Sequence, residues 1–272
     1  MLANFLIGLR EGLEIGLVVG ILVAYIRKVG RTEVLPKLWI GIALALGLAL
    51  GVGALLTWGP YGLSTQGQEG IGGVLSIVAV VLVTWMIFWM HKQSRTIKSE
   101  LETDVRRATM QTGKQALFLL AFFAVLREGI ELALFLTASA FASGAQETIF
   151  GALLGLAAAA ILGWGLFAST IRLDLRRFFQ VTGVLLVLFA AGLVAHGVHE
   201  FNEVGWIPAV IEHVWDLNPV LDEQSTLGMI LKALFGYNGD PSLTEVVAYL
   251  GYFTLIGVSL IRRDASPAPQ EA

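Results

Sequence analysis

Residues 37–58 read KLWIGIALALGLALGVGALLTW, and after Lys37 the stretch contains no charged side chain. A run of about 20 apolar residues is what one helix needs to cross the hydrocarbon core of a bilayer. The rest of the chain has the same character, since 56% of its 272 residues are hydrophobic and only 14% are charged. A soluble domain would carry about 25% charged residues. The composition therefore predicts an integral membrane protein.

Seven such stretches follow one another along the chain. We expect spans near residues 3–26, 37–58, 69–90, 115–142, 148–170, 178–199 and 244–261. The first span lacks the basic start of a cleaved signal peptide, so we expect a retained helix. The sequence thus predicts an all-α integral membrane protein with one transmembrane domain, residues 1–263, followed by a disordered tail, residues 264–272.

The distribution of basic residues predicts the orientation of these spans. Outside the spans, 15 Lys and Arg residues fall after spans one, three, five and seven, whereas only Lys232 falls on the other side. Because cytoplasmic loops are rich in Lys and Arg, the amino terminus is expected outside and the carboxyl terminus in the cytoplasm. The outer connection, residues 200–243, carries seven acidic residues. It is either a solvated loop or a vestibule that concentrates cations.

The composition also excludes several kinds of site. The chain has no cysteine, which excludes disulfides and thiolate metal sites. Its net charge of −3 gives no support for nucleic-acid binding, which needs a basic face. Any bound metal must therefore be held by carboxylate, imidazole or carbonyl groups.

A five-residue motif occurs twice, in the first and in the fourth expected span. Residues 10–14 read REGLE, and residues 127–131 read REGIE. Because the second copy lies three spans after the first, the two host helices run in opposite directions. The chain is therefore expected to contain two inverted three-helix repeats, residues 1–91 and 115–200, with the seventh helix added. Both motifs lie near the middle of their spans and so reach a similar depth.

The charges in these motifs predict a buried ion site. A charged group in mid-membrane costs about 2.5–3.5 kcal/mol, so the motifs must face protein, water or an ion. In each motif the two Glu residues are three positions apart and share one helix face. Together the four carboxylates offer oxygen ligands to a hard cation. The expected translocation site is Glu11, Glu14, Glu128 and Glu131.

The other motif residues support this site. Arg10 and Arg127 can each pair with the Glu four positions later, which offsets repulsion among the carboxylates when no ion is bound. Gly12 and Gly129 belong to stripes of small residues, which let helix backbones approach closely.

Two alternatives stay open for the motifs. Their charges could form interhelical ion pairs that only fix the packing, although ionisable residues inside a membrane are functional by default. The chain could also be a membrane di-iron oxidoreductase. Such enzymes typically use Glu-x-x-His, and neither motif has a His three residues after a Glu.

A second polar cluster closes the sixth span. His196, His199, Glu200 and Glu203 follow one helical stripe, and Glu69, at the start of the third span, can join them. Imidazole with carboxylate suits iron, zinc or manganese, so one interpretation is an outer metal site. The other interpretation is a helix end with solvated polar groups.

The two motifs, in spans one and four of a seven-span chain, resemble those of the oxidase-dependent iron permease family. The His-Glu-Phe-Asn-Glu stretch at residues 199–203 is similar to that family as well. The resemblance covers nearly the whole chain. It implies a high-affinity iron permease of the cytoplasmic membrane, which is a transporter and not an enzyme.

The resemblance also implies substrate and partners. Fe²⁺ or Fe³⁺ is the transported substrate, with lead or manganese as alternatives, and no cofactor is bound permanently. Because no large extension precedes the first span, a periplasmic or extracellular oxidase or iron-binding protein is expected as a separate partner. The sequence leaves the oligomeric state open.

Overall fold

The computed structural model describes residues 1–93, 114–167 and 174–264, and every regular element in these residues is a helix. The long helices are α1 (Leu2–Lys28), α2 (Leu35–Trp58), α3 (Thr65–Gln93), α5 (Lys114–Ser143), α6 (Ala145–Phe167), α7 (Leu175–Glu203) and α9 (Leu243–Asp264). The shorter elements are α8 (Thr226–Phe235), η1 (Thr32–Val34) and η2 (Gly59–Gly62). The prediction of an all-α fold is confirmed. The predicted disordered tail, from residue 265 on, and most of the basic connection after α3 lie outside the described residues.

Four of these helices, α2, α3, α6 and α7, are long and apolar enough to cross a membrane. Two others, α1 and α5, are 27 and 30 residues long but carry an Arg and two Glu residues near the middle. Large apolar side chains also point outward, including Leu50 on α2 and Trp164 on α6, which are 75% and 74% exposed. Lipid covers such a surface in a multi-pass membrane protein.

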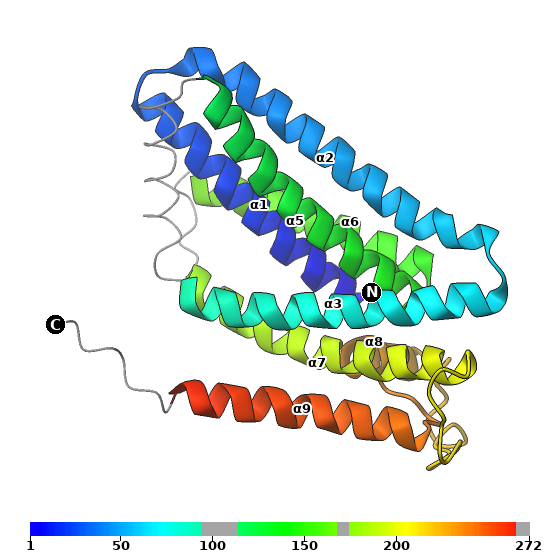
Figure 1. Cartoon of the computed structure of the whole chain (residues 1–272). Helices are drawn as coiled ribbons and strands as arrows, with labels where there is room; N and C mark the ends of the chain where they lie inside the picture. Colours follow the sequence, from blue (N-terminus) through cyan, green and yellow to red (C-terminus); the bar gives the residue numbers. More distant parts are fainter. Residues whose placement is uncertain (94–113, 168–173, 265–272) are drawn as a thin grey trace.

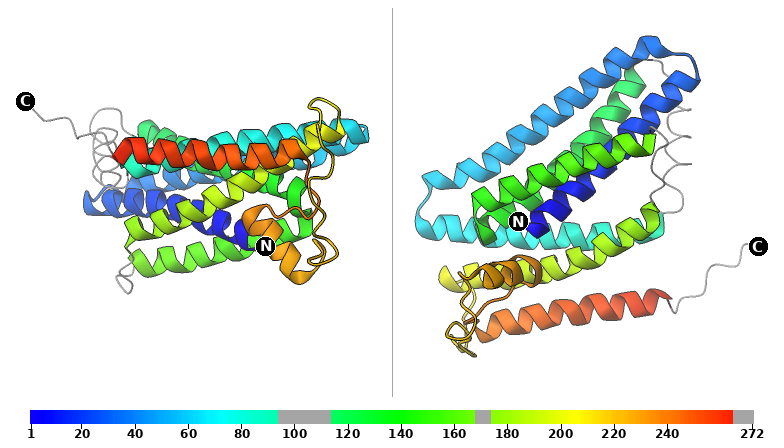
Figure 2. Two further views of the ribbon diagram at one scale, coloured as in Figure 1. Left: turned by 90° about the horizontal axis from the view of Figure 1, so that it is seen from below. Right: turned by 180° about the vertical axis from the view of Figure 1, so that it is seen from behind.

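The helices of the two halves of the chain pack crosswise. The most extensive contacts join α1 to α6, α2 to α5, and α3 to α7. The first helix of each half thus packs against the second helix of the other half, and the two third helices pack against each other. Figures 1 and 2 show α1, α2, α5 and α6 inclined to a second group formed by α3, α7 and α9.

The two helices that carry the motifs contact each other and run in opposite directions (Figure 1). Leu22 and Ile26, near the end of α1, share a buried apolar cluster with Leu117 and Ala121, near the start of α5. At the other end of α1, the amide of Asn4 donates a hydrogen bond to a residue at the start of α6, directly after α5. The motifs therefore meet from opposed helices in the interior.

The glycine of each motif lies where a helix of the other half approaches. A Cβ added at Gly12 would lie 2.7 Å from the Cβ of Ala159 on α6. A Cβ added at Gly129 would lie 2.7 Å from the Cβ of Ala49 on α2. Each of these contacts joins the first helix of one half of the chain to the second helix of the other half. Close approach at small residues is the way membrane helices pack tightly.

The connection between α7 and α9 covers one end of the bundle. It contains α8, which packs against α7. In Figure 1 this connection and η2 lie at the end opposite the turn between α1 and α2. Helix α9 runs along α7, and its Tyr252 hydroxyl lies 3.0 Å from the hydroxyl of Thr84 on α3. The bundle is thus closed on this side by α9 and at this end by the connection.

Candidate metal-translocation site

The motif on α1 is enclosed by protein. Arg10 Nη1 lies 2.8 Å from Glu11 Oε1, and Arg10 Nη2 lies 2.9 Å from Glu14 Oε1. Arg10 is 1% exposed and Glu11 is completely buried. The guanidinium group also contacts the sulfur of Met86 on α3, and it lies 5.8 Å from the ring centre of Phe179 on α7. This arginine therefore pairs with two carboxylates in a site that the protein encloses.

The motif on α5 has the same pairing in a more open setting. Arg127 Nε lies 3.0 Å from Glu131 Oε1 and 3.7 Å from Glu128 Oε1. Both carboxylates are buried, but the Arg127 side chain is 36% exposed. Its guanidinium carbon lies 5.5 Å from the ring centre of Trp85 on α3, a cation–π distance.

The two motifs meet at three carboxylates. One oxygen each of Glu11, Glu128 and Glu131 can be chosen so that all three lie within 4.8 Å of one another. The Oε2 atom of each of these residues is buried and has no hydrogen-bond partner in the described part of the chain. Buried carboxylates normally have hydrogen-bond or ion partners, and a hard cation is the partner that satisfies several at once. Glu14 lies beside this group but is paired with Arg10 and is not part of it.

The residues predicted for an outer metal site are spread more widely. His196 Nε2 lies 3.5 Å from Glu200 Oε1, and Glu69 on α3 lies close enough to Glu200 for their charges to repel each other. Glu203 is exposed. The residues predicted for the outer site are Glu69, His196, His199, Glu200 and Glu203. Among the described residues, no three of these bring their ligand atoms as close together as the three central carboxylates do.

A comparison with known protein families identifies the chain. Residues 1–262 match the model of the family described as "Iron permease FTR1 family". The chain belongs to this family. The membership confirms the resemblance seen in the motifs, and it confirms a transporter rather than an enzyme. With the apolar helices of the bundle, it also places this iron permease family member in the cytoplasmic membrane as a multi-pass protein.

Curated relatives in the iron permease FTR1 family match the chain along its length. The protein named ferrous iron permease EfeU from Shigella sonnei (strain Ss046) is 37% identical over 277 residues, which cover 100% of both chains. Its namesake from Escherichia coli O157:H7 has the same identity and coverage. The one from Yersinia pestis is 34% identical over 254 residues, covering 93% of this chain and 90% of the relative. No solved structure matches the chain.

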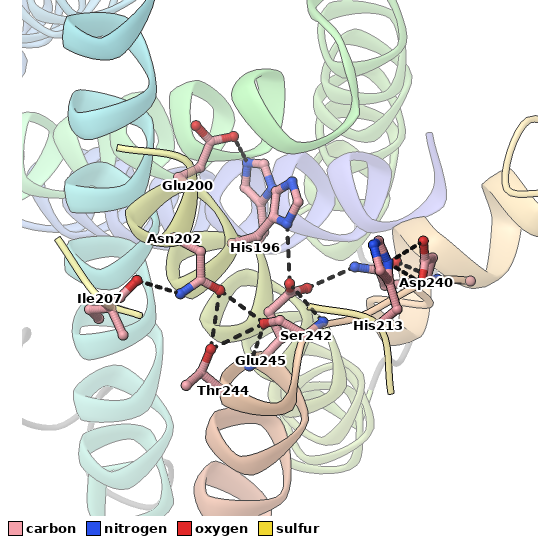
Figure 3. Close-up of polar contacts among 12 residues, drawn as sticks. His196, Glu200, Asn202, Ile207, His213, Asp240, Ser242, Thr244 and Glu245 are labelled. Atoms are coloured by element: carbon pink, nitrogen blue, oxygen red, sulfur yellow. Dashed lines mark hydrogen bonds and ion pairs between the residues drawn. The ribbon is translucent and has the colours of Figure 1, made fainter. Parts of the chain in front are cut away.

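One polar residue near the outer cluster was missed in the sequence. Glu245, in the first turn of α9, is 3% exposed and lies with its Oε1 atom 3.2 Å from His199 Nδ1. The Ser242 N–H donates to Glu245 Oε1, and the Glu245 N–H donates to Ser242 Oγ, which is a capping box. Figure 3 shows Glu245 beside Ser242 and Thr244, whereas Glu200 contacts His196. The signal was Ser-x-x-Glu directly before an apolar run.

Proposed function

We propose that this member of the iron permease FTR1 family is a high-affinity permease that moves iron across the cytoplasmic membrane through its central carboxylates. The observation that carries the proposal is the meeting of Glu11, Glu128 and Glu131, from opposed helices of the two halves, with unpartnered buried oxygens. The relatives are named ferrous iron permeases, which supports Fe²⁺ as the cargo.

The ion pairs explain how such a site tolerates the state without cargo. Four carboxylates close together in a dry interior repel one another, and each costs free energy to desolvate. Arg10 and Arg127 offset this repulsion at 2.8–3.7 Å. An arriving cation then supplies further positive charge to Glu11, Glu128 and Glu131. Glu14, one helical turn after Glu11, is the next carboxylate along α1 and can receive the ion as it moves on.

The topology proposed for this transport has seven spans with the amino terminus outside. Residues 1–91 and 115–200 form the inverted repeats, and α9 is the seventh span. The packing of α1 on α6 and of α5 on α2 supports this arrangement. In both contacts the first helix of one repeat packs against the second helix of the other, as two related repeats would. Reporter fusions after Arg31 and Arg263 should read cytoplasmic, and fusions at Gly62, Gly144 and Asp222 should read external. One cytoplasmic result among the last three contradicts the topology.

Competing cargoes and a competing activity can be separated by chemistry. Carboxylate oxygens also suit Mn²⁺, so manganese and lead are the alternative cargoes. A di-iron oxidoreductase has less support, because no histidine takes part in the carboxylate group that the structure describes. We also propose a separate oxidase or iron-binding protein at the outer face as the donor of iron. Oxygen consumption with ferrous iron in detergent would favour the oxidoreductase.

The decisive experiment measures iron uptake by the purified protein in liposomes. Radioactive iron is offered as Fe²⁺ and as Fe³⁺, with Mn²⁺, Zn²⁺ and Pb²⁺ as competitors. Glu11→Gln and Glu128→Gln should nearly abolish uptake, because an amide cannot supply the charge that a hard cation needs. Glu147→Gln is the control, since this carboxylate is 41% exposed and pairs with the amino-terminal ammonium group, 3.7 Å away, and not with a motif residue. Near-normal uptake by Glu11→Gln at normal membrane levels would remove the central site from the transport path.

A further inference from the structure

A cavity of about 270 Å³ lies at the outer end of the bundle, between α1, α5, α7, α8 and residues 236–240. We propose that this cavity is the loading site where the permease first binds its metal ion, with His199 and Glu245, which lie 3.2 Å apart, as the ligands and His196 beside them. The proposal rests on the proposed function, and it assigns a ligand, Glu245, that the sequence did not indicate. Three of the predicted outer residues, Glu69, Glu200 and Glu203, do not line this cavity.

The cavity runs from the surface into the protein. The side chain of His199, at its outer part, is 44% exposed. Asn4 on α1, which also lines it, is 1% exposed. At about 30 Å³ for each water molecule, the space holds a metal ion that keeps part of its hydration shell. An ion can therefore arrive from outside without first losing all of its water.

The polar groups of the cavity are arranged to receive a cation. Asn4 Nδ2 donates a hydrogen bond of 3.2 Å to Thr148 Oγ1, which leaves Asn4 Oδ1 as an acceptor. That oxygen is buried and has no hydrogen-bond partner among the residues that the structure describes. His196 Nε2 is buried as well and lies 3.5 Å from Glu200 Oε1, beside the cavity. Glu245 adds a carboxylate that is held in place by His199 and by Asn238, whose amide donates to Glu245 Oε2 at 2.7 Å.

The charges around the cavity favour a cation as well. Its lining contains three carboxylates, Glu223, Asp240 and Glu245, and one ammonium group, Lys232. Lys232 Nζ lies 2.9 Å from Glu223 Oε2, so the positive charge is neutralised within the lining. Imidazole nitrogens with a carboxylate form the ligand set expected for Fe²⁺ rather than for Ca²⁺ or Mg²⁺. The cavity therefore favours Fe²⁺ over Ca²⁺ and Mg²⁺ before the cation reaches Glu11, Glu128 and Glu131.

The cavity is in line with the central site but separated from it. Asn4 stands seven residues before Glu11, which places it on the same face of α1 about 10 Å away. Between these levels lie Ile7 on α1 and Phe135 on α5, which are 0% and 1% exposed and belong to one apolar cluster. An ion in the cavity is thus held outside an apolar layer, which must open before the ion reaches Glu11, Glu128 and Glu131.

The test measures initial rates of Fe²⁺ uptake into proteoliposomes over a range of Fe²⁺ concentrations. Glu245→Gln keeps the capping box, because Gln also accepts from the Ser242 N–H. This variant, and the double variant His196→Gln with His199→Gln, should raise the half-saturating concentration roughly tenfold or more, as loss of ligands or their supports does at metal sites. The maximal rate should change much less. The matched control is Glu203→Gln, an exposed carboxylate that does not line the cavity and should leave both values unchanged.

A direct binding measurement separates this proposal from the proposed function. Co²⁺ is added to detergent-purified protein carrying Glu11→Gln and Glu128→Gln, so that the central site is disabled. Visible absorption bands of imidazole-bound Co²⁺ should appear and should disappear when His196→Gln and His199→Gln are added. Normal half-saturation in Glu245→Gln, or no Co²⁺ bands, overturns the loading site. If Glu11→Gln still abolishes uptake into proteoliposomes, the permease proposal stands even though the loading site is overturned.

Discussion

The two copies of the motif have nearly the same sequence but different surroundings. On α1 the arginine is 1% exposed, pairs with two carboxylates at 2.8 and 2.9 Å, and is covered by side chains of α3 and α7. On α5 the equivalent Arg127 is 36% exposed and stacks against Trp85, a residue that is itself 50% exposed. One copy is therefore enclosed and the other lies partly at the surface of the bundle.

The proposed internal repeat therefore matches between the two halves in the helix contacts, but not in the side chains that surround the two motifs. The glycines have equivalent contacts at 2.7 Å in both halves. The carboxylates do not, because Glu131 joins the three-carboxylate group and its equivalent, Glu14, stays with Arg10. In the proposed transport, this asymmetry gives the ion distinct successive positions and gives equivalent residues unequal roles.

The largest expected effect compares the last Glu of each motif. Glu131→Gln should reduce the rate of iron uptake into liposomes by at least about a factor of ten, because it removes one charged ligand from the group of three. Glu14→Gln should retain a measurable share of the rate, since its carboxylate lies outside the group of three. Equal losses in the two variants, at equal protein levels, would show that Glu14 is a full ligand and that the site is symmetric.

The next effect compares the two arginines in stability. Arg10→Ala should lower the free energy of unfolding by about 3–5 kcal/mol, because it leaves two buried carboxylates without their partner. Arg127→Ala should cost clearly less, because the Arg127 side chain is 36% exposed and one of its two ion pairs is longer, at 3.7 Å. Thermal unfolding in detergent, followed by tryptophan fluorescence, gives the comparison. Partial recovery of Arg10→Ala by an added Glu14→Gln would identify charge imbalance as the cause, and no recovery would indicate lost packing instead.

The smallest effect tests the part of the repeat that is preserved. Gly12→Ala and Gly129→Ala should each destabilise the protein by about 1–3 kcal/mol, because the new methyl group overpacks the contact with the facing alanine. The two losses should be alike, since both contacts measure 2.7 Å. Gly16→Ala on α1 is the control, because nothing lies within 4 Å of its added Cβ. It should be neutral or slightly stabilising, as Ala favours helix over Gly.

The helices were largely predictable, and the differences have physical reasons. The span expected at residues 37–58 corresponds to α2, Leu35–Trp58. The span expected at 178–199 continues as helix to Glu203, because polar residues such as His199 leave the hydrocarbon region without ending the helix. The span expected at 148–170 begins earlier, at Ala145, directly after the tight turn at Gly144, whose φ is 92°. Hydropathy identifies the residues that lie within the hydrocarbon core, whereas the residues at which a helix begins and ends depend on caps and turns.

The candidate sites were predictable to different degrees. The central residues could be found because charge inside an apolar span is costly and the pattern occurs twice. The grouping of Glu11 with Glu128 and Glu131, without Glu14, could not be found, since it depends on how α1 and α5 pack against each other. Glu245 was missed because a carboxylate in a capping box has an ordinary local explanation. Its contact with His199 spans 46 residues of sequence.

The sequence by itself determined the membrane environment, the helices and the duplicated charged motif, because each depends on residues that are neighbours along one helix. Periodicity and hydropathy act over about 20 residues, so they could be read without knowing any contact. Only the tertiary structure decided which carboxylates meet, which arginine is enclosed and which polar residues surround the outer cavity. Those choices depend on contacts between helices that lie apart in the chain, such as α1 with α6 and α2 with α5, whose small residues pack closely.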